Sequence, residues 1–275
     1  MALFTDSSLI TISDLEVYES TLSKIASTHN INIESKTAIT LAAIGDRLLG
    51  RLMRAGGANN PSLNPVFSSQ YYLVTLPPQK SWTLTLNNVV VTGPLKRWIS
   101  YELLSQIFSE AYNVQLNDRF REKLLYYSAR SKETEDSLCS LGIGVVYHPL
   151  AQPAIAQVAQ GTGTLPAGIV TVQTTWVDAT GKEGSPSLLL PVTLSDSSSM
   201  SVSIVPAQTA PPTTAVGWNA YVGANGASPA RQNAAALPLN MTWTAPATGF
   251  VTGAAAPWGQ QPDSFVLDPQ RQWRG

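Results

Sequence analysis

The sequence predicts an α+β protein of two domains, in which a helical N-terminal half precedes a β-rich C-terminal half. Charged residues concentrate in the first half: residues 1–150 contain 13 acidic and 13 basic residues, whereas residues 151–275 contain 5 and 4. Glycine and proline have the opposite distribution, with 13 before residue 151 and 25 after it. Because both residues oppose helices and favour turns between short strands, we expect helices first and strands afterwards.

Two helices are expected before residue 55. The run Ser13–Glu16 fits a capping box, and apolar residues follow it at three-to-four-residue spacing, which predicts a helix over about 14–29. A second apolar stripe predicts a helix from Glu34 to Arg54. Gly56-Gly57 follows it and suits a left-handed helix stop.

The end of the second predicted helix is basic. Arg47, Arg51 and Arg54 are four and three residues apart, so they share one helical face. They could bind phosphate or a carboxylate-rich partner. The alternative interpretation is that they are cations favoured by the helix C-terminus.

The remainder of the first half predicts a β-hairpin and two more helices. Alternating apolar residues between Tyr71 and Val91, with Asn87-Asn88 as a turn, indicate a hairpin or extended loop. Gly93-Pro94 is suited to begin a third helix, and Asn117-Asp118 to cap a fourth. Together these elements predict a four-helix bundle-like domain with an inserted β-hairpin.

We expect the domain boundary near residue 150. The run Tyr147–Pro153 and the small residues through Gly163 have the composition of a linker or an extended arm. The predicted domains are therefore residues 1–150, 151–257 and a C-terminal arm at 258–275.

Short strands separated by turns are expected after the boundary. The predicted strands are Ile169–Val177, Leu188–Leu194, Met200–Val205, Trp218–Val222 and Met241–Thr244. Strands at this spacing are typical of an immunoglobulin-like or fibronectin-like β-sandwich. Cys139 is the single cysteine, so this sandwich would be of the disulfide-free kind.

The arm has the composition of an interface anchor. It contains Trp258, and near its end Trp273 is flanked by Arg271 and Arg274. Tryptophan and arginine are enriched at the centres of protein interfaces. A disordered tail is the alternative, since chain termini are often disordered.

The sequence offers no defensible catalytic set, so we expect a protein that is not an enzyme and needs no metal or cofactor. The common hydrolase, phosphate-loop and dinucleotide motifs are absent. His29 falls on an apolar stripe and His148 precedes a proline, which disfavours both as catalytic bases. Cys139 lies between leucines and is interpreted as a core residue. Trp176 and Trp218 are expected in the sandwich core, although a sugar-stacking platform is another use of tryptophans.

Charge and hydropathy limit which partners and which cellular location we expect. The net charge of −1 gives no overall field to attract nucleic acid. Neither a basic, apolar leader nor a run of about twenty apolar residues occurs. We therefore expect folding in the cytoplasm, without export or membrane insertion.

Two segments carry a resemblance to a known class of proteins. Val172–Ser187 is a strand ending in a Gly-Ser-Pro-Ser turn, and Gly217–Gly223 is a strand with alternating aromatic residues. They resemble the immunoglobulin-like modules of tailed-bacteriophage structural proteins. The order of elements in the first half is similar to that of head-to-tail connector proteins, also called adaptors or neck proteins.

The resemblance implies a structural virion protein that forms a homo-oligomeric ring between the portal protein and a tail or tail-terminator protein. It would be assembled in the host cytoplasm and located at the head-tail junction. Trp258, Arg271, Trp273 and Arg274 would then be assembly contacts. Arg47, Arg51 and Arg54 would face neighbouring subunits or touch passing DNA without reading its sequence. The alternative is another tail, baseplate or capsid-decoration protein whose sandwich binds cell-surface glycans.

Overall fold

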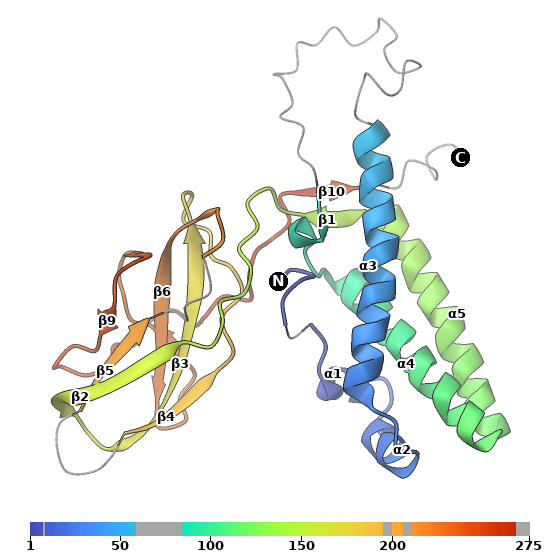
Figure 1. Cartoon of the computed structure of the whole chain (residues 1–275), viewed down its shortest axis with the longest axis horizontal. Coiled ribbons are helices and arrows are strands. Elements are labelled where there is room, and N and C mark those ends of the chain that lie inside the picture. Colours follow the sequence, from blue (N-terminus) through green and yellow to red (C-terminus); the bar gives the residue numbers. More distant parts are fainter. Residues whose placement is uncertain (8, 59–83, 195–199, 206–210, 268–275) are drawn as a thin grey trace, which may run out of the picture. The chain divides into compact units, whose positions relative to one another are not determined.

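The computed structural model describes the chain except for residues 8, 59–83, 195–199, 206–210 and 268–275. Helices occupy the first half and antiparallel sheets the second, as expected for an α+β protein (Figure 1). The chain divides into two compact units. The β unit contains Met1–Ser7 and His148–Gln261, and the helical unit contains Ser8–Tyr147 and Pro262–Gly275.

The helical unit is built around one central helix. Its described α-helices are α1 (Ile12–Glu16), α2 (Leu22–Thr28), α3 (Ile33–Ala58), α4 (Gly93–Gln115) and α5 (Asp118–Leu141). Helix α4 packs against both α3 and α5 (Figure 1). Its buried side chains include Trp98, Leu103, Ile107 and Phe108. Asn117 caps α5, accepting a hydrogen bond from the backbone N–H of Arg119 at 2.9 Å, as predicted.

The single helix predicted over 14–29 is wrong, because α1 and α2 are separate helices. The N-cap of α1 is Thr11 and not Ser13: the Thr11 hydroxyl accepts from the Asp14 N–H at 3.2 Å, and the Asp14 carboxylate accepts from the Thr11 N–H at 2.9 Å. The break between the helices brings Glu19 inward, where its carboxylate pairs with Lys123 of α5.

One further expectation about the helical unit is wrong, and another is mostly untested. The helix predicted to stop at Gly56-Gly57 continues through Ala58 in α3. The hairpin predicted between Tyr71 and Val91 lies mostly outside the described residues. Its expected turn at Asn87-Asn88 is part of a 3-10 turn, η1 (Leu86–Asn88), in which the Asn88 amide accepts from Thr85 and donates to the Val146 carbonyl.

The β unit contains two antiparallel sheets. One has the order β2 (Gln157–Leu165), β5 (Met200–Val205), β9 (Trp243–Thr244). The other has the order β4 (Leu190–Leu194), β3 (Gly168–Asp178), β6 (Ala215–Ala224), β7 (Ala230–Arg231), and β8 (Leu237–Pro238) also pairs with β6. The five predicted strands are thus confirmed, with ends shifted by up to three residues. The stretch through Gly163 interpreted as a linker is instead strand β2.

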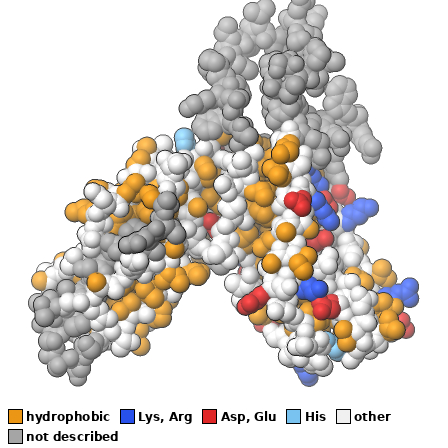
Figure 2. Space-filling view, in the orientation of Figure 1, with side chains coloured by type: hydrophobic (Ala, Val, Ile, Leu, Met, Phe, Trp, Pro, Cys, Tyr) orange, Lys and Arg blue, Asp and Glu red, His pale blue; other side chains and the backbone are white. Residues whose placement is uncertain are grey.

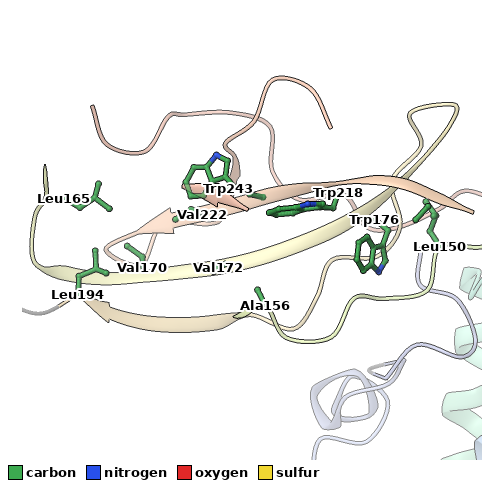
Figure 3. Close-up of a cluster of buried hydrophobic side chains, with 12 residues drawn as sticks. Leu150, Ala156, Leu165, Val170, Val172, Trp176, Leu194, Trp218, Val222 and Trp243 are labelled. Atoms are coloured by element: carbon green, nitrogen blue, oxygen red, sulfur yellow. The ribbon is translucent and has the colours of Figure 1, made fainter. Parts of the chain in front are cut away.

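Side chains from both sheets share one hydrophobic core. Trp176 of β3 and Trp218 of β6 occupy partner positions, and Trp243 of β9 joins them from the other sheet (Figure 3). All three indoles are at least nine-tenths buried. The prediction that Trp176 and Trp218 lie in the core is confirmed.

The remaining two described strands, the first and the last in the chain, pair in the helical unit. Strand β1 (Ile143–Val145) pairs antiparallel with β10 (Ser264–Val266), which lies within the segment expected to be an extended arm. The Asp263 carboxylate also accepts a hydrogen bond from the Tyr147 N–H at 2.9 Å. The chain therefore returns to the helical unit after it leaves the β unit.

Candidate functional site

Trp258 is the large apolar side chain with the highest exposure among the described residues. Trp258 is 91% exposed, although it belongs to the compact β unit. The other described tryptophans of that unit are in its core. Trp258 is therefore the described tryptophan of the β unit whose ring is exposed.

The residue after Trp258 fits closely against the rest of the β unit. Gly259 has a φ of +94°, a conformation that favours glycine. A Cβ atom added there would lie 2.2 Å from the Met1 carbonyl oxygen and 2.5 Å from the Ser185 hydroxyl oxygen. Only a glycine allows the chain to pass this close to both.

Gln260 then anchors the segment by its side chain. It is 4% exposed. Its Oε1 accepts from the Leu150 N–H at 2.8 Å, and its Nε2 donates to the His148 carbonyl at 2.8 Å. Trp258 is thus held on a backbone that is fixed on its C-terminal side, and an exposed ring on a fixed backbone loses little entropy on binding.

The N-terminal residues complete this anchor, which the sequence analysis did not identify. Leu3 and Phe4 are buried in the β unit. The buried Asp6 carboxylate accepts from the Leu3 N–H at 2.7 Å and the Gln152 N–H at 2.8 Å. Burial raises the pKa of Asp6 above its ordinary value, against the effect of these hydrogen bonds. The apolar pair Leu3-Phe4 was the available sequence signal.

The arginines of α3 contact carboxylates of the helical unit itself. The Arg51 guanidinium lies 2.6 Å from Glu135 of α5, and Arg47 lies 3.6 Å from Glu102 of α4 and 3.5 Å from Glu135. Both guanidinium groups also lie within 6 Å of the centre of the buried Trp98 ring. The structure therefore brings Arg47 and Arg51 into a cluster that ties α3 to α4 and α5.

The other predicted contact residues are not described. The side chain of Arg54 lies outside the described part of α3, and Arg271, Trp273 and Arg274 fall in the segment 268–275, which is also outside it. Their assembly roles stay predictions. Trp258 is the one predicted arm contact whose surroundings are described.

On the β unit, three polar side chains contact one carboxylate, that of Glu183. Glu183 accepts from the Tyr221 hydroxyl at 2.6 Å and the Thr175 hydroxyl at 2.7 Å, and Arg231 lies 3.6 Å away. Burial, and then the hydrogen bond to Glu183, raise the pKa of Tyr221. These bonds fasten the turn after β3 onto the sheet.

Charged side chains are unevenly distributed. On the face drawn in Figure 2 they gather over the helical unit, whereas the β unit is mainly uncharged. Within the described ranges, no group of three His, Cys, Asp or Glu residues is placed to hold a metal ion. Nor does any helix in the described part combine the length and apolar character needed to cross a membrane.

No protein-family model matches the chain, and no curated protein matches it in sequence.

Proposed function

We propose that this chain is a structural protein of a tailed-bacteriophage virion, a ring-forming head-to-tail adaptor without enzymatic activity. The observation that carries the proposal is Trp258, an almost fully exposed indole on an anchored backbone. Exposed aromatic residues at rigid positions are suited to be the central anchors of protein interfaces. The neighbouring copy, the portal protein or the tail protein would bury it.

The strand order supports an immunoglobulin-like module. Strands β2 to β7 pair as strands B, C, C′, E, F and G do in that fold: β2 with β5, β3 with β4 and β6, and β6 with β7. Trp176 of β3 corresponds to the buried tryptophan of strand C. Strand β9 departs from this order, because it follows β7 and β8 in the chain yet pairs with β5.

The arginine cluster fits a structural role within each subunit better than contact with DNA. Arg47 and Arg51 are matched by Glu102 and Glu135. Contact with passing DNA would require these ion pairs to open, since the same guanidinium groups would have to bind phosphate. We therefore assign the anchoring of neighbours to Trp258 and the C-terminal segment.

The test is a point substitution in the phage genome that carries this gene. Deleting residues 258–275 would also remove Gln260 and β10, so loss of assembly after that deletion would not distinguish an interface from a folding defect. Trp258→Ala leaves both in place. The matched control is Val216→Ala, which removes another exposed apolar side chain of the β unit.

The proposal predicts DNA-filled heads without tails for Trp258→Ala and normal particles for Val216→Ala, by electron microscopy. Tailed, infectious Trp258→Ala particles would contradict the anchoring role. Tailed particles that fail to adsorb to cells would instead favour the glycan-binding alternative. Among the described tryptophans of the β unit, that alternative would use Trp258, because Trp176, Trp218 and Trp243 are buried in the core.

A further inference from the structure

Strand β2 is an edge strand whose outer side is unpaired. It bonds to β5 in unbroken antiparallel register from Gln157 to Thr162, and the register shifts before Leu165. Among the described residues, no backbone hydrogen bond reaches the other side of this six-residue run. Its free N–H and C=O groups form a template for a further strand.

The other edges of these sheets are poorer templates. Strands β7 and β9 have two residues each. Strand β4 contains Pro191, which lacks an N–H group. The run Gln157–Thr162 of β2 contains neither proline nor charge, and Ala159 within it is exposed. Proteins commonly protect such edges with lysine, proline or a very short strand, and β2 has none of these.

The whole sheet around β2 is uncharged. None of the residues of β2, β5 and β9 is Asp, Glu, Lys or Arg, and the sequence contains none of these from Ser137 to Val177. A charged edge would repel its own copy when two identical strands pair, because like charges would lie opposite or diagonal to each other. An uncharged edge has no such penalty, so nothing in its charge opposes pairing with the same edge of a second copy.

We propose that two copies of this chain pair through their β2 strands, antiparallel and across a two-fold axis, to form one continuous six-stranded sheet. Side chains alternate between the two faces of a strand. The core-facing side chains of both copies therefore share one face only if even-numbered residues oppose even-numbered ones and odd-numbered residues oppose odd-numbered ones. Centring the pair on Ala159 or Gln160 satisfies this condition over the run 157–162. The pairing does not depend on the proposed adaptor role and describes the free chain before assembly.

A charge exchange at Ala159 tests this pairing. In either register, Ala159 opposes itself or lies diagonal to its own copy. Ala159→Lys and Ala159→Glu should each weaken the dimer at least about tenfold, and an equimolar mixture of the two should restore it. Sedimentation velocity of the full-length chain over a concentration series measures both effects. The control is Ala235→Lys, which adds the same charge at another exposed position of the β unit.

The results separate this contact from others. A native chain that stays monomeric at about 100 μM would overturn the proposal. So would a dimer that neither Ala159 variant weakens, or one that the mixture does not restore. Hydrogen exchange gives a second measurement: β2 amides should exchange more slowly as the concentration of the native chain rises. An oligomer held by Trp258 would dissociate in Trp258→Ala and persist in Ala159→Lys.

Discussion

At the scale of single residues, Glu19 shows how one buried carboxylate joins separate elements. It accepts from Thr21 and Tyr127 and pairs with Lys123. Burial alone would raise its pKa, but the hydrogen bond from Lys123 and the other contacts outweigh burial, so the pKa lies below the ordinary value of 4.5. Ionised Glu19 therefore stabilises the helical unit.

We predict that Glu19→Gln lowers the free energy of unfolding of the helical unit by about 2 kcal/mol near neutral pH. Because the native pKa is depressed, this contribution is complete above the unfolded pKa and is lost as pH falls through the native pKa. Urea unfolding, followed by helical circular dichroism, should show the difference from the native chain shrinking in acid. Glu133→Gln, at an exposed surface pair, is the control. An equal loss at neutral and acidic pH would contradict this explanation.

Gly259 is the second residue with a specific prediction. Gly259→Ala combines a positive φ with a steric clash against Met1 and Ser185. We expect it to destabilise the β unit by about 2 kcal/mol and to speed hydrogen exchange at Leu3. Gly181→Ala has a similar φ of +82° but open space around the added Cβ, so it should cost less. Equal effects of the two substitutions would mean that the close contact does not matter.

At the scale of elements, the N-cap of α1 lies at a different residue from the one the sequence predicted. The Thr11 side chain forms a capping box with Asp14, whereas the sequence pattern placed the box at Ser13–Glu16. Thr11→Ala should cost about 1 kcal/mol, and Ser13→Ala clearly less. Thermal unfolding of the two variants measures this. A larger loss of stability for Ser13→Ala than for Thr11→Ala would instead support the N-cap predicted at Ser13.

The sequence correctly predicted the elements that are determined by residues close together in the chain. Asn117 caps α5 because its side chain acts on the next residues, and β3 forms where valine and threonine favour a strand. Strand β2 was missed because Ala159 and Gly161 have low strand propensity, and its pairing with the distant β5 decides its structure. Between α1 and α2, Glu19 pairs with Lys123, which lies more than a hundred residues away in sequence.

The candidate site was predictable only in part, for the same reason. A tryptophan near the end of the chain indicated Trp258 as a contact residue, and its exposure agrees with that use. The anchor beneath it, formed by Asp6 and Gln260, joins segments from both ends of the sequence and leaves no local pattern. The partners Glu102 and Glu135 of the α3 arginines are likewise distant in sequence.

At the scale of the whole molecule, we propose different tasks for the two units. The helical unit engages the arginines of α3 in internal ion pairs, and the β unit presents an anchored, exposed indole and an uncharged sheet edge. Repeated contacts in a ring would convert one modest anchor per subunit into a stable assembly. The central claim is that Trp258 is buried when the chain is in the virion.

Cryo-electron microscopy of the neck of virions produced from the genome that carries this gene tests that claim most directly. The account predicts a ring of copies of this chain between the portal and the tail, with the Trp258 ring buried against a neighbouring copy, the portal or the tail protein. A neck that lacks this chain, or a ring in which Trp258 faces solvent, would contradict it.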